Sequence, residues 1–267
     1  FVNSLASGLQ TGLSWADAFT ELQVALFAVA DRPGVTEIWV AQGVYRPTHR
    51  VEPENPRTAT FQLLAGVSIY GGFNGSETAV DQRILMQNQS ILHGDRYSND
   101  SGDDDDPSRD ESSYHVVTIP EAGPVARLDG FTITGGHAGK TDPQENYRTG
   151  GGLFGSGGSV HLTNCIFDRN WALWGGGAMH LTDAAELRIV NCTLSNCVTK
   201  QRHGGAALLD GCRTSIEYTV IDANEARSYS NSGGALAVYG GTLDINSSTF
   251  TRNLADIHGA ESYGAPG

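Results

Sequence analysis

One pattern of apolar residues recurs through the second half of the chain and limits the folds that it can adopt. Five units align on one apolar position at intervals of 34, 27, 27 and 29 residues. Mostly apolar residues also stand five and seven positions earlier, so two short segments alternate with a period of two. We expect strands stacked coil on coil at about 4.8 Å, with like residues in interior columns. The aligned residues are Ile133, Phe167, Leu194, Ile221 and Phe250, and the neighbouring column holds Leu162, Ile189, Ile216 and Ile245.

Two further features of the repeat predict how each coil turns. Asn170, Asn224 and Asn253 recur three positions after the aligned residue, and we expect them to hydrogen-bond along their own stack at a bend. A glycine pair such as Gly176–Gly177 precedes each unit and permits a tight corner. Each repeat therefore predicts about three short strands and no helix, wound right-handed as parallel crossovers are.

A leucine-rich repeat is the rival fold. The spacing Leu162-x-x-Cys165-x-Phe167-x-x-Asn170 fits its pattern. The remainder of each repeat is rich in glycine and resembles strand, whereas a leucine-rich repeat carries a leucine-bearing helix there. We therefore reject the rival fold.

The first half is less regular. The run Ser14-Trp15-Ala16-Asp17 resembles a capping box, and apolar residues then recur at helical spacing, so we expect a helix at about 14–29 over the open N-terminal end. The predicted fold is all-β: a right-handed single-stranded parallel β-helix, or solenoid, with an N-terminal capping α-helix. One domain would span 1–267, with the cap at 1–30, irregular first coils at 31–125 including an acidic insertion at 95–112, and regular coils at 126–267.

Charge excludes one class of partner. The formal net charge is −13, and so acidic a surface does not attract a phosphate backbone. We therefore expect no nucleic-acid partner. No stretch is long and apolar enough to span a membrane, so we expect no membrane span either.

The four cysteines, Cys165, Cys192, Cys197 and Cys212, do not have zinc-site spacing. Cys165 and Cys192 occupy successive places in one inward column, where we expect small buried apolar groups. A disulfide between them stays open, since it depends on geometry.

Several runs resemble a known class of proteins. SWADAFTELQVAL, EIWVAQGVYRPT, FQLLAGVSIYGGFNGSET and LDGFTITGG are similar to the start of bacterial right-handed parallel β-helix repeat proteins of the pectate-lyase-like superfold. The GGA and FxxN pairs resemble the repeats of chlamydial polymorphic outer-membrane adhesins, although Leu194 and Ile221 replace Phe and Cys197 replaces Asn. These resemblances cover nearly the whole chain. They imply the solenoid fold and a secreted or cell-surface location, and say little about activity.

The loops between the FxxN bend and the next glycine pair are the first candidate site, because insertions in a solenoid gather on one flank. Aromatic rings there could contact sugar rings, and Lys or Arg could hold uronate carboxylates. The resemblance implies a basic residue or a Tyr/His pair as the base of a lyase. The alternative is that the loops are simply polar and that the tryptophans pack against the coil. The substrate-binding candidates are Tyr147, Arg148, Trp171, Trp174, Lys200, Arg202, His203, Arg227 and Tyr229, and the catalytic candidates among them are Lys200, Arg202 and His203.

An acidic column is the second candidate. Asp168 and Asp222 follow inward residues, so they face outward two coils apart, roughly 9–10 Å. That separation is at the far edge of the range for inverting glycosidases. We favour a solvated sheet face with spaced charges.

The acidic insertion is the third candidate. Asp95, Asp100, Asp103 and Asp105 offer hard oxygen ligands at a density that suits calcium, although the pattern is not an EF-hand loop. A mobile acidic insertion is the equal alternative. Any calcium would be structural, and no cofactor is expected to be required.

We therefore predict an extracellular or cell-surface module that binds a polysaccharide or surface glycan, or an adhesin-like structural protein. The alternative is a polysaccharide lyase or glycoside hydrolase acting on an acidic polysaccharide along the loop-bearing face. No cap follows Asn253 in the sequence, so we expect either further coils or self-association at that end.

Overall fold

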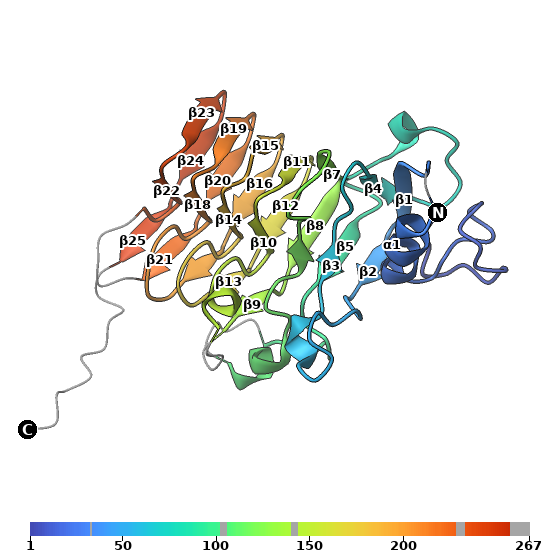
Figure 1. The fold of residues 1–267 in the computed structure, drawn as a ribbon, viewed down its shortest axis with the longest axis horizontal. Coiled ribbons are helices and arrows are strands. Elements are labelled where there is room, and N and C mark those ends of the chain that lie inside the picture. The colour runs from blue at the N-terminus through green and yellow to red at the C-terminus, as the bar shows by residue number, and fades with distance from the viewer. Residues whose placement is uncertain (33, 102–105, 140–143, 228–232, 257–267) are drawn as a thin grey trace, which may run out of the picture.

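The computed structural model describes residues 1–32, 34–101, 106–139, 144–227 and 233–256, and they form a parallel β-helix (Figure 1). Each regular coil gives one strand to each of four parallel sheets, which we number in the order that a coil visits them. Sheet 1 contains β1 (Glu37–Ala41), β4 (Ser68–Phe73), β7 (Ala126–Asp129), β11 (Ser159–Thr163), β15 (Glu186–Val190), β19 (Arg213–Glu217) and β23 (Thr242–Asn246). Sheet 2 contains β2 (Gly43–Tyr45), β5 (Ser90–His93), β8 (Phe131–Thr134), β12 (Ile166–Asp168), β16 (Thr193–Ser195), β20 (Val220–Asp222) and β24 (Thr249–Thr251).

The other two sheets complete each coil. Sheet 3 contains β9 (His137–Ala138), β13 (Trp171–Ala172), β17 (Val198–Thr199), β21 (Glu225–Arg227) and β25 (Leu254–Asp256). Sheet 4 contains β3 (Phe61–Gln62), β6 (Val117–Thr118), β10 (Leu153–Ser156), β14 (Met179–Thr182), β18 (Ala207–Asp210) and β22 (Leu236–Tyr239). The helical segments are α1 (Leu22–Ala30) and the 3₁₀ turns η1 (Pro56–Thr58), η2 (Val80–Gln82), η3 (Pro107–Glu111) and η4 (Glu145–Arg148).

A regular coil has four strands where the sequence predicted about three. The additional strand is the short one of sheet 3, such as β13, which follows the asparagine bend directly. Two residues are too few to show a period of two, so the pattern predicted a loop there. The regular coils in the described residues contain no α-helix, which agrees with the rejection of the leucine-rich repeat.

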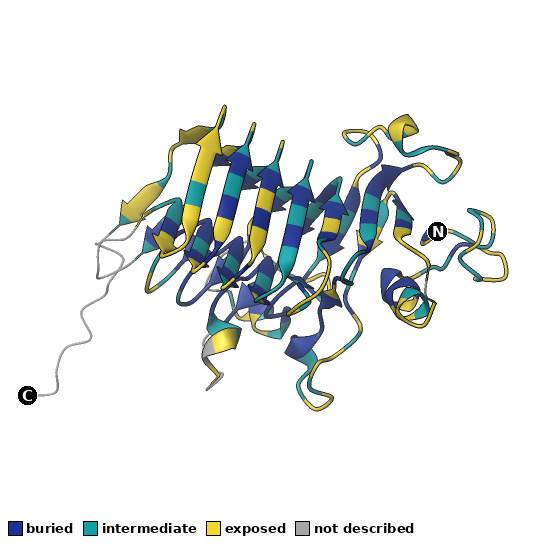
Figure 2. Cartoon of the chain, turned by 45° about the horizontal axis from the view of Figure 1, so that its top comes forward, coloured by how far each residue is buried: buried dark blue, intermediate teal, exposed yellow. Residues whose placement is uncertain are grey.

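The predicted interior columns are present. Leu162 pairs with Leu128 and with Ile189, and the same register continues to Ile216 and Ile245. The column of Phe167 pairs in the same way through sheet 2. These side chains are buried in one continuous apolar core, seen as dark bands on successive strands in Figure 2.

The asparagine column forms the predicted ladder. Asn224 accepts a hydrogen bond from the backbone N–H of Cys197 at 3.0 Å, and its amide donates to the carbonyl of Leu194 at 2.8 Å. Its own backbone N–H donates to Asn253 Oδ1 at 3.1 Å. Each asparagine therefore satisfies polar groups of the preceding coil that would otherwise be buried unpaired at the bend.

A second ladder runs through the column that begins with Cys165. The backbone N–H of Cys165 donates to the Cys192 sulfur at 3.4 Å, and that of Cys192 donates to Thr219 Oγ1 at 3.2 Å. All four cysteines are free and buried. The thiols of this column thus act as hydrogen-bonding groups as well as small apolar ones.

The N-terminal helix is shorter than predicted, since α1 begins at Leu22. Ser14 and Asp17 do make the hydrogen bonds of a cap, with Asp17 N–H donating to Ser14 Oγ at 3.1 Å. The chain stays extended afterwards because the backbone of Phe19 pairs with residues 1 and 3 of the N-terminal segment. That segment also pairs with the edge of β1, and α1 packs Leu22 and Leu26 onto the end of the core (Figure 1).

The last described coil exposes part of its apolar column. Ile245 is 43% exposed and Phe250 is 39% exposed, whereas their counterparts in earlier coils are buried. Figure 2 shows this coil as largely exposed. The idea that further coils or a second copy cover it stays a prediction, because residues 257–267 lie outside the described residues.

Candidate functional site

Three side chains at equivalent positions of successive coils stack on the flank between sheets 3 and 4. The residues that follow them are linked by two parallel bridges, from Thr149 to Gly175 and from Gly175 to His203. The guanidinium carbon of Arg148 lies 4.4 Å from the Trp174 ring centroid, and that of Arg202 lies 4.0 Å from it. Arg148 comes from the coil before Trp174 and Arg202 from the coil after, so we place one guanidinium on each side of the ring. We call these three residues the arginine–tryptophan column.

The column restrains two positive charges on an acidic protein. Each contact between a guanidinium and the indole contributes about 0.5–1 kcal/mol at an exposed site. A guanidinium that lies flat on a ring keeps its N–H donors at its edge, where they suit the two oxygens of a carboxylate. The two guanidiniums come from coils two apart and share one ring, so their carbons lie roughly 8 Å from each other.

The structure changes the predicted roles of the two tryptophans. Both ring faces of Trp174 contact arginines, so Trp174 orders the arginines and has no face for a sugar. Trp171 is 0% exposed and packs with Leu173 and Val198 in a small apolar cluster, separate from the main core, against which Trp174 also packs. The Trp171 ring is covered and has no exposed face, so the predicted contact between Trp171 and a sugar stays a prediction that this structure does not favour.

The basic candidates are distributed along the same flank. His203 follows Arg202 and lies edge-on to Tyr239, with 5.3 Å between ring centroids. Burial, together with the charge of Arg202, lowers the pKa of His203, which favours its neutral form. Lys200 lies just after β17, in the same loop.

Two further candidates contribute little. Arg227 ends β21 and pairs with Glu225 at 2.8 Å. Tyr229 lies outside the described residues.

The acidic column has the predicted register but is engaged in structural contacts. Asp168 pairs with Ser195, which pairs with Asp222, so the two acids are two coils apart. Ser195 Oγ donates to Asp168 at 2.9 Å. Hydrogen bonds from Arg252 and Thr251 lower the pKa of Asp222. A lowered pKa is the opposite of what a general acid needs, and these residues stand on sheet 2, across the asparagine bend from Lys200.

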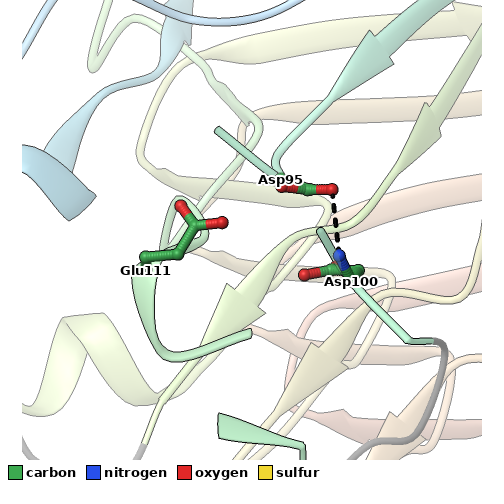
Figure 3. Close-up of side chains that lie close together, drawn as sticks. All are labelled: Asp95, Asp100 and Glu111. Atoms are coloured by element: carbon green, nitrogen blue, oxygen red, sulfur yellow. Dashed lines mark hydrogen bonds between the residues drawn. The ribbon is translucent and has the colours of Figure 1, made fainter. Parts of the chain in front are cut away.

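The acidic insertion gathers three carboxylates. Asp95, Asp100 and Glu111 each place one carboxylate oxygen within 4.8 Å of the other two (Figure 3). The sequence predicted Asp95 and Asp100 but missed Glu111, while Asp103 and Asp105 lie outside the described residues. Oxygen ligands of this kind suit calcium or magnesium. Arg109 already lies 3.6 Å from Asp100 and offsets part of the negative charge.

The three carboxyl groups differ in protonation. Burial, followed by the neighbouring Asp95, raises the pKa of Glu111 to about 7. Burial also favours the neutral form of Asp95, but hydrogen bonds from the backbone N–H groups of Asp100, Ser98 and Tyr97 outweigh it and lower the pKa. Glu111 is therefore half-protonated near neutral pH, which a bound cation would reverse.

A groove that the sequence did not predict lies over the outer face of sheet 4. It has a volume of about 410 Å³, and its floor includes Gln62, Thr118 and Phe154, which are in register on β3, β6 and β10. Tyr147 is the one predicted site residue in its lining. Because Tyr147 directly precedes Arg148, the groove ends beside the arginine–tryptophan column. The first coils are too irregular in sequence for this register to be recognised.

Comparison with known proteins agrees with the architecture. The model of a family described as "Right handed beta helix region" matches residues 127–264. No curated protein and no solved structure matches the chain. Among the described residues no helix has the length and apolar character needed to cross a membrane.

Proposed function

Because this chain belongs to the right-handed β-helix family, we propose that it is an extracellular or cell-surface module that binds an acidic polysaccharide along the flank between sheets 3 and 4. The arginine–tryptophan column carries the proposal. It provides two restrained guanidiniums of the kind that hold carboxylate groups. An adhesin-like or structural role is compatible with such binding, since attachment to a surface glycan needs no turnover.

The direction of the column supports a polymeric ligand. Arg148 and Arg202 follow one another along the solenoid axis, so a chain lying parallel to that axis would meet both guanidiniums with acidic groups on separate sugars. Two weak contacts on one chain reinforce each other, because the second forms at high effective concentration. A single uronate should therefore bind much more weakly than an oligomer.

A binding assay with matched variants tests the proposal. We expect Arg202→Gln to weaken binding of oligouronates about tenfold, or about 1.4 kcal/mol. Arg188→Gln is the control, since Arg188 lies on sheet 1 and pairs with Glu217 at 3.2 Å. Equal affinity of Arg202→Gln and wild type for every acidic glycan that binds would contradict the proposal.

The adjacent pair Arg202 and His203 favours a lyase as the second candidate function. A neutral imidazole next to a cation could remove the proton beside a uronate carboxylate that the cation holds. A carbon–carbon double bond would then form as the neighbouring glycosidic C–O bond breaks, and the departing oxygen would take a proton from water. The absorbance of unsaturated uronate measures turnover. Product release by the wild-type protein that is absent in His203→Gln would establish the lyase activity. Binding without any such product would leave the non-catalytic function.

We also propose that Asp95, Asp100 and Glu111 hold a structural calcium ion. Calcium would replace the proton that Glu111 holds and tie the end of η3 to the loop that follows β5. The midpoint of unfolding should then rise with added calcium in wild type and not in Glu111→Gln. The same rise in both proteins would contradict a site at this cluster.

A further inference from the structure

We infer that the groove on sheet 4 is a second subsite, which binds one uncharged sugar ring next to the acidic group held by the arginine–tryptophan column. The inference deepens the proposed function and rests on it for the identity of the polymer. It assigns the ligand as a polysaccharide in which a neutral residue neighbours an acidic one. Four features of the groove lead to this assignment.

The walls of the groove are fixed in place. Glu52 Oε1 accepts hydrogen bonds from the Tyr147 hydroxyl at 2.9 Å and from the Gln144 amide at 3.0 Å. These bonds join the loop before η1 to the loop that carries η4. The Tyr147 ring is also stacked on Tyr114 with 4.6 Å between centroids. A site whose walls are already ordered loses little entropy when a ligand binds.

The lining is polar but almost uncharged. Hydroxyl and amide groups of Thr60, Gln62, Thr118 and Asn146 surround the space, and Glu121 is the one carboxylate among the described lining residues. Burial lowers the pKa of the lining residue His115 to about 4, so it is neutral at physiological pH. This chemistry suits a ligand with many hydroxyl groups and no charge.

An apolar surface accompanies these polar groups. Phe154 projects from β10 into the lining, with His115 stacked on it at 4.7 Å between centroids. Tyr147 adds a second ring on the side wall. A pyranose has apolar C–H edges as well as hydroxyl groups, so it matches a lining of rings and hydrogen-bonding groups.

One buried acceptor in the lining has no partner. His115 is 6% exposed, and its Nδ1 lies 2.9 Å from the carbonyl of Gly150, to which it donates. That bond fixes Nε2 as an acceptor, and Nε2 has no hydrogen-bond partner among the described residues. An unmet acceptor is costly to bury, so a ligand hydroxyl that reaches Nε2 when the side chains over it move would gain a hydrogen bond there.

The test titrates the full chain with neutral monosaccharides: glucose, galactose, mannose and N-acetylglucosamine. We expect at least one to bind weakly and to shift the ring resonances of Tyr147 and Phe154. Gln62→Trp places a bulky ring at the exposed end of the floor and should weaken that binding at least about tenfold. Gln42→Trp is the matched control, because Gln42 is exposed and does not line the groove.

The outcomes separate this inference from the proposed function. Neutral sugar binding that Gln62→Trp loses, and that Arg202→Gln and Gln42→Trp keep, supports the groove as a subsite. If none of the four sugars shifts these resonances in the wild-type protein, the inference is overturned, even if oligouronates bind. Neutral sugar binding without any acidic glycan binding retains the subsite and rejects the proposed function.

Discussion

The asparagine ladder has one gap, and filling it should stabilise the protein. Cys197 stands between Asn170 and Asn224 in the column, and its sulfur lies 3.8 Å from the carbonyl of Phe167. The equivalent amide nitrogen of Asn224 lies 2.8 Å from its carbonyl in the preceding coil. A thiol is a poor substitute for an amide, because it is a weak donor and a weak acceptor. Cys197→Asn should therefore replace two weak thiol hydrogen bonds with amide hydrogen bonds, one donated to Phe167 and one accepted from the Asn170 backbone.

The size of the effect follows from the number of bonds. Each amide hydrogen bond has a net value of about 0.5–1.5 kcal/mol, but the thiol already makes weak versions of both. The free energy of unfolding should therefore rise by about 1 kcal/mol, less any cost of the slightly larger side chain. Asn224→Cys is the reverse exchange, and it should lower the free energy of unfolding by at least as much. Cys212→Asn is the control, since Cys212 is equally buried but lies outside the asparagine column.

Denaturant unfolding in the presence of a reductant measures the three variants. Amide hydrogen exchange at residues 170 and 197 localises the change, which matters because neighbouring coils of a solenoid can open separately. If Cys197→Asn were no more stable than wild type while Asn224→Cys were strongly destabilised, the ladder would depend on something other than hydrogen bonds between coils. If Cys212→Asn gained as much as Cys197→Asn, position in the column would be irrelevant.

Three further predictions concern protonation and the column. Between pH 4.5 and about 7 Glu111 holds a proton in the folded protein that it has lost in the unfolded chain. The free energy of unfolding therefore falls as pH rises through this range. Glu111→Gln should remove about 1–2 kcal/mol of that fall, measured by denaturation of both proteins across the range. Burial lowers the pKa of His115 and of His180 to about 4, so stability is lost as pH falls from 6.5 towards 4, and His180→Gln should unfold at a lower pH than wild type. An unchanged acid midpoint in His180→Gln would contradict that pKa. Trp174→Ala removes the ring that both guanidiniums contact, so it should weaken oligouronate binding about threefold to tenfold with little change in fold by circular dichroism. Unchanged affinity would show that the ring does not order the arginines.

The repeat allowed the sequence to predict the core but not every strand. The register of the strands could be predicted because each interior column repeats one class of residue at a regular interval, as in Leu162, Ile189 and Ile216. The strand β13 was missed because two residues carry no periodicity. The start of α1 was misplaced because the backbone of Phe19 pairs with the N-terminal segment, a contact between distant residues that local capping signals do not reveal.

The candidate site was predicted only in part. Arg148, Trp174 and Arg202 each stand two residues before a glycine with left-handed backbone geometry, Gly150, Gly176 and Gly204. Aligning the repeats on those glycines would have placed the three side chains in one column. Their stacking also explains why Trp174 cannot present a ring face to a sugar.

Other parts of the site had no sequence signal. Glu111 joins Asp95 only through the path of an irregular insertion, and no repeat marks it. The groove depends on the loop before η1 meeting the loop of η4 through Glu52. Contacts of this kind follow from the folded path of the chain and have no counterpart in a local pattern.

The most direct test of the account observes the side chains of the flank while an acidic glycan binds. Titration with an oligouronate should shift the Arg148 and Arg202 guanidinium resonances and the Trp174 indole resonance together, and added salt should reverse those shifts. Binding that shifts resonances elsewhere and leaves all three unchanged would contradict the assignment of this flank as the polysaccharide site.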